Sequence, residues 1–367
     1  MIRRTVTAVC ITSCLVAFHC IAATPVFQDV LDTPALESPL AIKYLLNGVA
    51  VAGKRLVCVG QRGHILYSDD QGKKWTQASV PVSSDLVAVH FPSPQNGWAV
   101  GHDGVVVHSS NGGSSWVKQF DGRAAAQVMA SYHKGWKNCS SCHEKIEPPK
   151  GGPQGSEAAL MADLKSFTEQ GPDKPFLDVW FENETTGFIV GAYNLIFRTV
   201  DGGKSWEPWF DRTENKKRFH LYAIRPVGQD LFISGEQGLI LKLDRKTGRF
   251  AAQKTPYNGT FFGITGKPGS IIAFGLRGNV FRSTNGGVGW QKVETGVQAG
   301  LTGATVTEDG RIVLVSQSGD LLVSSDNGSS FKSVKTDQSI FATAVAAIGK
   351  DALLIAGLRG VQVQPLK

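Results

Sequence analysis

A short pattern that recurs five times constrains the fold of this chain more than any other feature. It places Ser or Thr two residues before Asp or Asn, then Gly two residues later, then an aromatic residue three further on, as in residues 199–206 (TVDGGKSW). The other copies occupy residues 68–75, 109–116, 283–290 and 324–331. The Asp or Asn oxygen can accept backbone N–H groups in such a turn, and Gly supplies a positive φ. The pattern, called the Asp box below, therefore predicts a repeated tight turn between two strands.

A second turn, Gly-x-x-Gly, gives the period of the repeat. It occurs at residues 60–63, 101–104, 235–238, 275–278 and 357–360, with degenerate copies at 191–194 and 316–319. Successive turns start 41, 90, 44, 40, 41 and 41 residues apart. A period near 40 with four short strands per unit is typical of a β-propeller blade. We therefore predict an all-β fold, a seven-bladed β-propeller with four-stranded blades over residues 24–367, in which blade 4 has lost its Asp box (residues 244–250, DRKTGRF).

Two departures from the repeat need separate explanations. The seventh unit ends soon after its third strand, so we expect the early apolar run at residues 26–31 to add the fourth strand, close the ring and remove an exposed edge. The double-length interval holds an insertion at residues 121–175, between blades 2 and 3, with helices expected at 123–132 and 156–169. By blade geometry the insertion shares one face with the Gly-x-x-Gly turns, and the Asp boxes lie on the opposite face.

The N-terminus and the composition suggest where the protein works. Residues 1–23 combine two arginines with an apolar run and small residues before Thr24, which indicates a signal peptide. We expect an exported, periplasmic protein that is soluble and monomeric. Its 42% hydrophobic and 19% charged residues suit an ordinary globular protein, and the net charge of +7 comes without the Lys/Arg runs of nucleic-acid binders.

The insertion contains the one motif with specific chemistry. Cys139, Cys142 and His143 form the C-x-x-C-H pattern of covalent c-type haem attachment, for which Met129, Met161 or His133 offers a second axial ligand. A metal site formed with His133 is an alternative, and a short disulfide or free thiols is another. All three readings stay open, and no other cofactor is expected.

Three arginines occupy equivalent places in Gly-x-x-Gly turns. Arg62, Arg277 and Arg359 come from blades 1, 5 and 7. Guanidinium groups gathered on one face would bind carboxylates or an acidic segment of a partner, whereas isolated ones would be solvated turn residues. The carboxylates of the Asp boxes, in contrast, should be held in their turns and are not expected to act as acids or bases.

The pattern resembles two groups of known proteins. Asp boxes recur in sialidases, but the Arg-Ile-Pro segment expected near the start of a sialidase propeller is missing, so a glycoside hydrolase is disfavoured. Residues 41–364 as a whole resemble the photosystem II stability/assembly factor family, notably residues 176–181 (FLDVWF) leading into 187–191 (GFIVG). The resemblance implies a non-catalytic protein that binds an exported segment of a membrane-associated protein complex, partly through an arginine patch. Relatives in bacteria without photosystems look like exported accessory proteins, and the sequence does not identify the partner.

Overall fold

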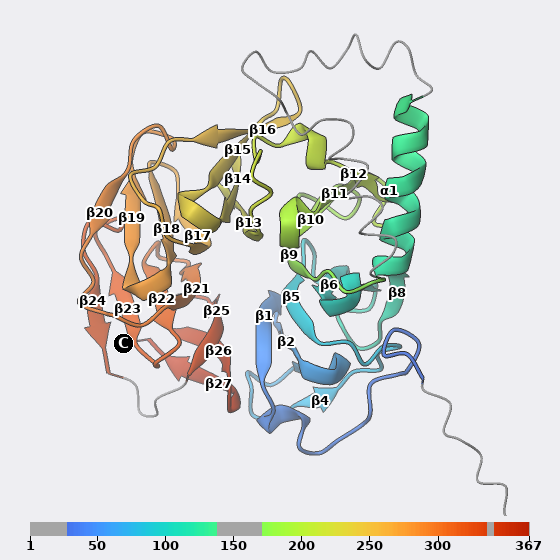
Figure 1. Cartoon of the computed structure of the whole chain (residues 1–367). Helices are drawn as coiled ribbons and strands as arrows, with labels where there is room; N and C mark the ends of the chain where they lie inside the picture. The colour runs from blue at the N-terminus through green and yellow to red at the C-terminus, as the bar shows by residue number, and fades with distance from the viewer. Residues whose placement is uncertain (1–27, 138–170, 336–340, 367) are drawn as a thin grey trace, which may run out of the picture.

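The computed structural model describes residues 28–137, 171–335 and 341–366, and these form seven antiparallel sheets arranged in a ring (Figure 1). The first strands of the sheets contact one another all the way round the centre, and β1 meets β25 to complete the circle. The strands of the first four blades are β1 (Leu46–Ala52), β2 (Arg55–Gly60), β3 (Ile65–Ser68) and β4 (Thr76–Gln77); β5 (Leu86–His90), β6 (Gly97–Gly101), β7 (Val106–Ser109) and β8 (Val117–Phe120); β9 (Phe176–Phe181), β10 (Gly187–Gly191), β11 (Ile196–Thr199) and β12 (Glu207–Pro208); β13 (Leu221–Val227), β14 (Asp230–Gly235), β15 (Ile240–Asp244) and β16 (Arg249–Gln253). The last three blades contain β17 (Phe261–Lys267), β18 (Ser270–Gly275), β19 (Val280–Ser283) and β20 (Gln291–Val293); β21 (Leu301–Val306), β22 (Ile312–Ser316), β23 (Leu321–Ser324) and β24 (Lys332–Val334); β25 (Ala342–Ile348), β26 (Ala352–Gly357) and β27 (Gly360–Pro365). The predicted seven-bladed propeller is confirmed.

Blades are held together by apolar side chains that interlock between neighbouring sheets. The second strands β6, β10 and β18 are buried along their whole length, because each lies between two other blades. At the junction of blades 2 and 3 the rings of Trp98 and Phe181 stack with centroids 3.7 Å apart. Every blade therefore depends on its neighbours for its core, as expected of a propeller.

The Asp boxes form the turns that the sequence predicts. In blade 3 the Thr199 hydroxyl accepts the Gly203 N–H at 2.9 Å, and the Asp201 carboxylate accepts the Ser205 N–H at 2.9 Å. Hydrogen bonds of this kind also lower the pKa of Asp326 in blade 6 to about 2, chiefly from Ser330. These carboxylates are structural groups that stay ionised.

The prediction for ring closure is wrong in the part of the run that the structure describes. Blade 7 has three strands there, and Val30 and Leu31 lie in a turn outside blades 1 and 2. Val30 O accepts the Ser83 N–H at 2.8 Å, and Leu31 is 1% exposed in a cluster with side chains of both blades. The apolar side chain of Leu31 is thus buried far from blade 7. The ring closes instead by direct packing of blade 1 against blade 7, where Thr343 Oγ1 donates to Leu46 O at 2.6 Å.

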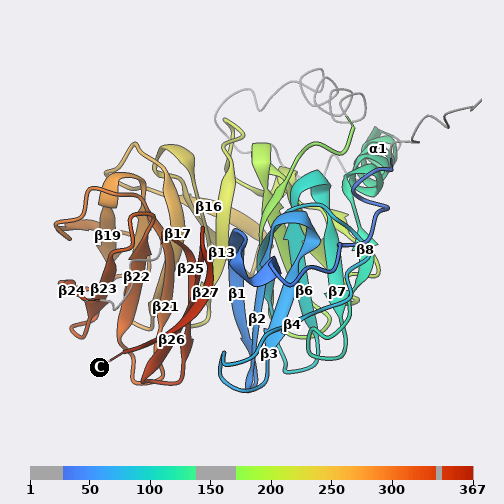
Figure 2. The same ribbon diagram turned by 90° about the horizontal axis from the view of Figure 1, so that it is seen from below.

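Helix α1 (Gly122–Lys137) is the one helix of the insertion within the described residues. It follows β8 directly and stands at one end of the blades, beside the ring (Figure 2). Its first turn contacts the Gly-x-x-Gly turn η3 (His102–Gly104) of blade 2. The helix predicted at residues 123–132 is therefore confirmed and extends further, and its expected position on the side of the Gly-x-x-Gly turns is correct. The helix predicted at 156–169 lies outside the described residues.

Candidate functional site: the Gly-x-x-Gly face

Four Gly-x-x-Gly turns and the degenerate copy at 191–194 share one backbone conformation that presents a side chain to solvent or to a neighbouring turn. They are η2 (Gln61–Gly63), η3, η4 (Ala192–Asn194), η6 (Glu236–Gly238) and η7 (Leu276–Gly278). In each the second residue after the first Gly has a φ of 53–57°, in the left-handed region. These residues are Arg62, Asp103, Tyr193, Gln237 and Arg277. We call the surface formed by these turns, the blade 7 turn and α1 the Gly-x-x-Gly face.

The three predicted arginines are all exposed on this face, at separate turns. Arg62 and Arg277 have left-handed backbones, whereas Arg359 lies in a two-residue hairpin in which Gly357 pairs with Gly360. None of the three guanidinium groups has a carboxylate within 4.0 Å among the described residues, and no contact joins any two of them. The basic patch therefore stays a prediction, with three unpaired cations available for it.

Apolar side chains are exposed beside these arginines. The guanidinium of Arg359 lies over the ring of Phe341, 5.8 Å from its centroid, and the Leu358 N–H donates to Phe341 O at 3.1 Å. Phe341, Leu358, Leu276 and Tyr193 are all large apolar residues that remain exposed. An arginine beside exposed aromatic and aliphatic groups is the composition found at the core of many protein–protein interfaces.

A row of aromatic rings crosses this face from blade 3 to blade 5, and the sequence reasoning missed it. Tyr193 packs on His220 with centroids 4.6 Å apart, and Tyr222 packs on Phe262 at 5.6 Å. Glu236 Oε2 lies 2.8 Å from His220 Nδ1 and orients the imidazole. Tyr222 and Phe262 each occupy the bulge at the start of their strand, where the register shifts. The sequence signal for this row was an aromatic residue at the second position of the first strand of a blade, as at Tyr222 and Phe262.

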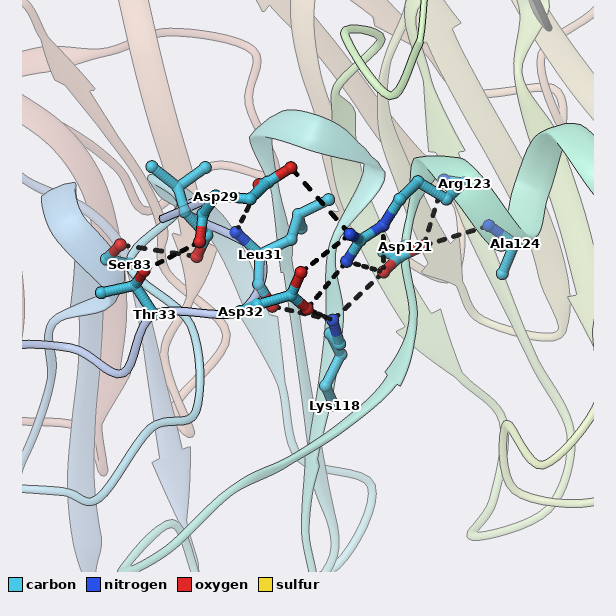
Figure 3. A network of polar contacts seen from close by, with 10 residues as sticks. Asp29, Leu31, Asp32, Thr33, Ser83, Lys118, Asp121, Arg123 and Ala124 are labelled. Atoms are coloured by element: carbon cyan, nitrogen blue, oxygen red, sulfur yellow. Dashed lines mark hydrogen bonds and ion pairs between the residues drawn. The ribbon is translucent and has the colours of Figure 1, made fainter. Parts of the chain in front are cut away.

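The insertion helix is anchored to the ring and to the N-terminal segment by the ionic cluster in Figure 3. The Asp121 carboxylate caps α1 by accepting the Ala124 N–H at 3.0 Å. Arg123 forms a bidentate pair with Asp32 at 2.8 and 2.9 Å, and Lys118 reaches the same carboxylate at 3.0 Å. Hydrogen bonds from Arg123 and Lys118 hold the pKa of Asp32 well below its usual range. These contacts fix the start of the insertion at the edge of the Gly-x-x-Gly face.

The predicted haem or metal ligands are not placed by the structure. Cys139, Cys142, His143 and Met161 lie outside the described residues. Met129 is buried at 8% exposure in the core between α1 and blades 2 and 3, so it is occupied in packing rather than open to a haem. The described residues contain no group of His, Cys, Asp and Glu able to hold a metal ion. The haem or metal site therefore stays a prediction.

Comparison with known proteins relates the chain to one family. The family model described as "Photosynthesis system II assembly factor YCF48" matches residues 166–331. The photosystem II assembly lipoprotein Ycf48 of Synechococcus sp. (strain CC9902) is 26% identical over 194 residues, which cover 51% of this chain and 57% of that protein. The photosystem II stability/assembly factor HCF136 of Arabidopsis thaliana is 20% identical over 260 residues, covering 54% of this chain and 64% of its own length. The chain thus spans less than two thirds of these relatives.

Solved structures agree on the fold. A structure described as YCF48 bound to D1 peptide superposes with a TM-score of 0.62 at 14% identity, covering 91% of this chain and 99% of that one. At this identity the likeness concerns the propeller fold itself. No helix in the described ranges is long and apolar enough to cross a membrane.

Proposed function

Because the chain is a photosystem II assembly factor-like seven-bladed β-propeller, we propose that it is an exported, non-catalytic assembly or accessory factor. It binds an exported segment of a membrane-associated protein complex, and it does so through the Gly-x-x-Gly face. The relatives are named assembly factors, which supports a role in binding rather than catalysis. The solved structure is described as bound to D1 peptide, which supports a peptide-like ligand here.

One observation carries the choice of face. Arg62, Arg277 and Arg359 present cations without carboxylate partners among the described residues, and Arg359 lies next to the exposed Phe341 and Leu358. A segment with carboxylates and apolar residues would satisfy both kinds of group at once. The rigid ring fixes the spacing of the turns, so little conformational entropy is lost on binding.

A membrane capture experiment tests this proposal. The tagged protein is incubated with detergent-solubilised membranes of its source organism, and retained proteins are identified by mass spectrometry. In the variant Arg62→Gln/Arg277→Gln/Arg359→Gln we expect retention of the partner to fall ~10-fold or more, because several charge-assisted contacts are lost together. The matched control is Lys73→Gln/Lys74→Gln/Lys204→Gln, which removes the same charge from exposed lysines of the Asp boxes on the other face.

The two variants separate a site from a general charge effect. Retention should be unchanged in the lysine variant and should decline with added salt for the unmodified protein. If both variants retain less of the partner by the same factor, the interaction is nonspecific attraction to a basic protein. Full retention by the arginine variant would remove the arginines from the interface.

A further inference from the structure

Four of the five Asp boxes, those of blades 2, 3, 5 and 6, are tied to the preceding blade by one recurring hydrogen bond. In each case the residue after the Asp or Asn of the box accepts a hydrogen bond at its carbonyl oxygen. The donor is a long polar side chain of the preceding blade. The four pairs are Arg55 to Gly112 at 3.1 Å, Gln119 to Gly202 at 3.0 Å, Lys242 to Gly286 at 3.4 Å and Arg282 to Asn327 at 2.7 Å. In two of these pairs the donor is a cation of the third strand, Lys242 in blade 4 and Arg282 in blade 5. These two residues occupy equivalent positions in the third strand of their blades. A box carbonyl is therefore the normal partner of a cation at that position.

Blade 3 has a cation at this position but no carbonyl to receive it. Arg198 pairs with Phe188 across β10 and β11 as Arg282 pairs with Ile272 in blade 5. The next blade is blade 4, whose third strand runs on to Asp244 and turns without an Asp box. The Arg198 guanidinium lies instead over the ring of Trp209, 5.1 Å from its centroid. Among the described residues Arg198 has no hydrogen bond and no carboxylate within 4.0 Å.

A hollow of about 370 Å³ occupies the place of the missing box. Its volume is at the lower end of the range for small-molecule sites. The apolar part of its wall comes from both blades: Trp180, Phe188, Trp209, Leu231 and Leu243. The turns that contribute to its lining, at 182–186 and 245–248, lie on the Asp-box side of the ring, away from the Gly-x-x-Gly face.

The charges around the hollow do not balance. Arg245 is paired with Glu182 at 3.0 Å, and Arg212, which also lies over Trp209, is paired with Glu207 at 2.9 Å. Arg198 and Lys246 line the hollow too, and neither has a carboxylate within 4.0 Å in the described part of the chain, although Lys246 lies near enough to Asp244 to help lower the pKa of that carboxyl. Arg198 and the exposed Lys246 therefore leave an excess of positive charge beside the aromatic wall.

We propose that the hollow between blades 3 and 4 binds a small organic carboxylate with an apolar body. A carboxylate oxygen takes the place of the box carbonyl that Arg198 lacks, and the planar guanidinium can hold both oxygens of the group. Lys246 adds a second positive charge at the rim. The apolar body packs on Trp180 and the half-buried Leu243, because Arg198 and Arg212 already cover the ring of Trp209. This apolar contact favours an organic carboxylate over a bare inorganic anion. This site is independent of the proposed partner-binding face.

Isothermal titration calorimetry on the purified protein tests the site with three probes. They are 3-phenylpropionate, its neutral amide 3-phenylpropionamide, and inorganic phosphate. We expect saturable binding of 3-phenylpropionate, and at least ~10-fold weaker binding of the other two, since each lacks either the charge or the apolar body. In Arg198→Gln the dissociation constant for 3-phenylpropionate should rise ~10-fold or more, and in the exposed Lys246→Gln about 3-fold.

The control variant is Arg282→Gln, at the same repeat position in blade 5, which should leave binding unchanged. Thermal unfolding of every variant checks that the propeller is folded. An absence of heat with 3-phenylpropionate, equal binding of the amide, equal binding of phosphate, or an equal loss in Arg282→Gln would each overturn the proposal. Unchanged binding in both Arg198→Gln and Lys246→Gln would do so as well.

Discussion

Replacing Arg225 with Met should lower the free energy of unfolding by about 2–3 kcal/mol at neutral pH, because it leaves a buried carboxylate without its cation. Asp178 lies on the inner strand β9 with its side chain 3% exposed, and it accepts hydrogen bonds from the Ile224 N–H at 2.7 Å and from the Arg225 guanidinium. Loss of a fully buried partner typically costs 3–5 kcal/mol. The Arg225 side chain is 40% exposed, so water can replace part of its contribution.

The pH dependence of this deficit identifies its cause. Burial raises the pKa of Asp178 from 3.8, although Arg225 and the Ile224 N–H oppose the shift. A raised pKa in the folded state means that protonation favours folding, and that this gain is lost as the pH rises through the raised value. Without Arg225 the pKa rises further. The deficit of Arg225→Met should therefore shrink as the pH falls through the raised pKa of Asp178 toward 3.8. His90, whose burial lowers its pKa to about 3, stays neutral over this window.

Denaturant unfolding of four proteins completes the test: the unmodified chain, Asp178→Asn, Arg225→Met and the double variant. If the cost comes from an unpaired charge, Arg225→Met should cost much less in the Asp178→Asn background than alone. An equal, pH-independent cost in both backgrounds would assign the effect to lost packing of the arginine stem.

Gly278→Ala should destabilise the propeller by about 2–5 kcal/mol. Gly278 is the second glycine of a Gly-x-x-Gly turn, with a φ of +69°, and a Cβ there would lie 1.8 Å from Val297 O. The left-handed conformation costs an L-residue about 1–2 kcal/mol, and moving a backbone carbonyl in a packed turn adds about 1–3 kcal/mol. Thermal or denaturant unfolding measures the sum.

Gly296 provides the matched control for this substitution. Its φ is +74°, but no atom lies within 4 Å of the position that a Cβ would take. Gly296→Ala should therefore cost only the backbone strain of about 1–2 kcal/mol. Equal costs at Gly278 and Gly296 would mean that the second glycine is required for its φ alone, and that the turn can make room for a methyl group.

The features predicted from the sequence are those written within one repeat. The Asp boxes and the Gly-x-x-Gly turns determine the number and order of blades, and the alanine-rich run at 123–132 predicts the first helix of the insertion. Features that depend on two blades were missed. Leu31 belongs to an apolar run typical of a strand. In the structure it lies in a turn instead, and apolar side chains of blades 1 and 2 bury it. Arg198 lacks an acceptor because the following blade has no box, which only the packed ring reveals.

The sequence predicts equivalent places for the three arginines, but the turn that carries Arg359 differs from the turns that carry Arg62 and Arg277. Gly357 and Gly360 have the spacing of the other turns, but the residues between them form a two-residue hairpin. Arg359 is consequently presented beside Phe341, whereas Arg62 and Arg277 are not tied to an aromatic ring of the described chain in this way. A motif thus predicts the place of a side chain in a propeller more reliably than its neighbours.

Site-specific photo-crosslinking in the source organism tests most directly whether the Gly-x-x-Gly face holds a membrane protein. A photoreactive amino acid is placed at Tyr193 or Leu358 on that face, and at Val200 or Val288 on the Asp-box face; all four side chains are more than half exposed. If the Gly-x-x-Gly face binds the partner, adducts with one membrane protein should form from Tyr193 and Leu358 and none from Val200 or Val288. Adducts from the Asp-box positions alone, or equally from both faces, would contradict binding through this face.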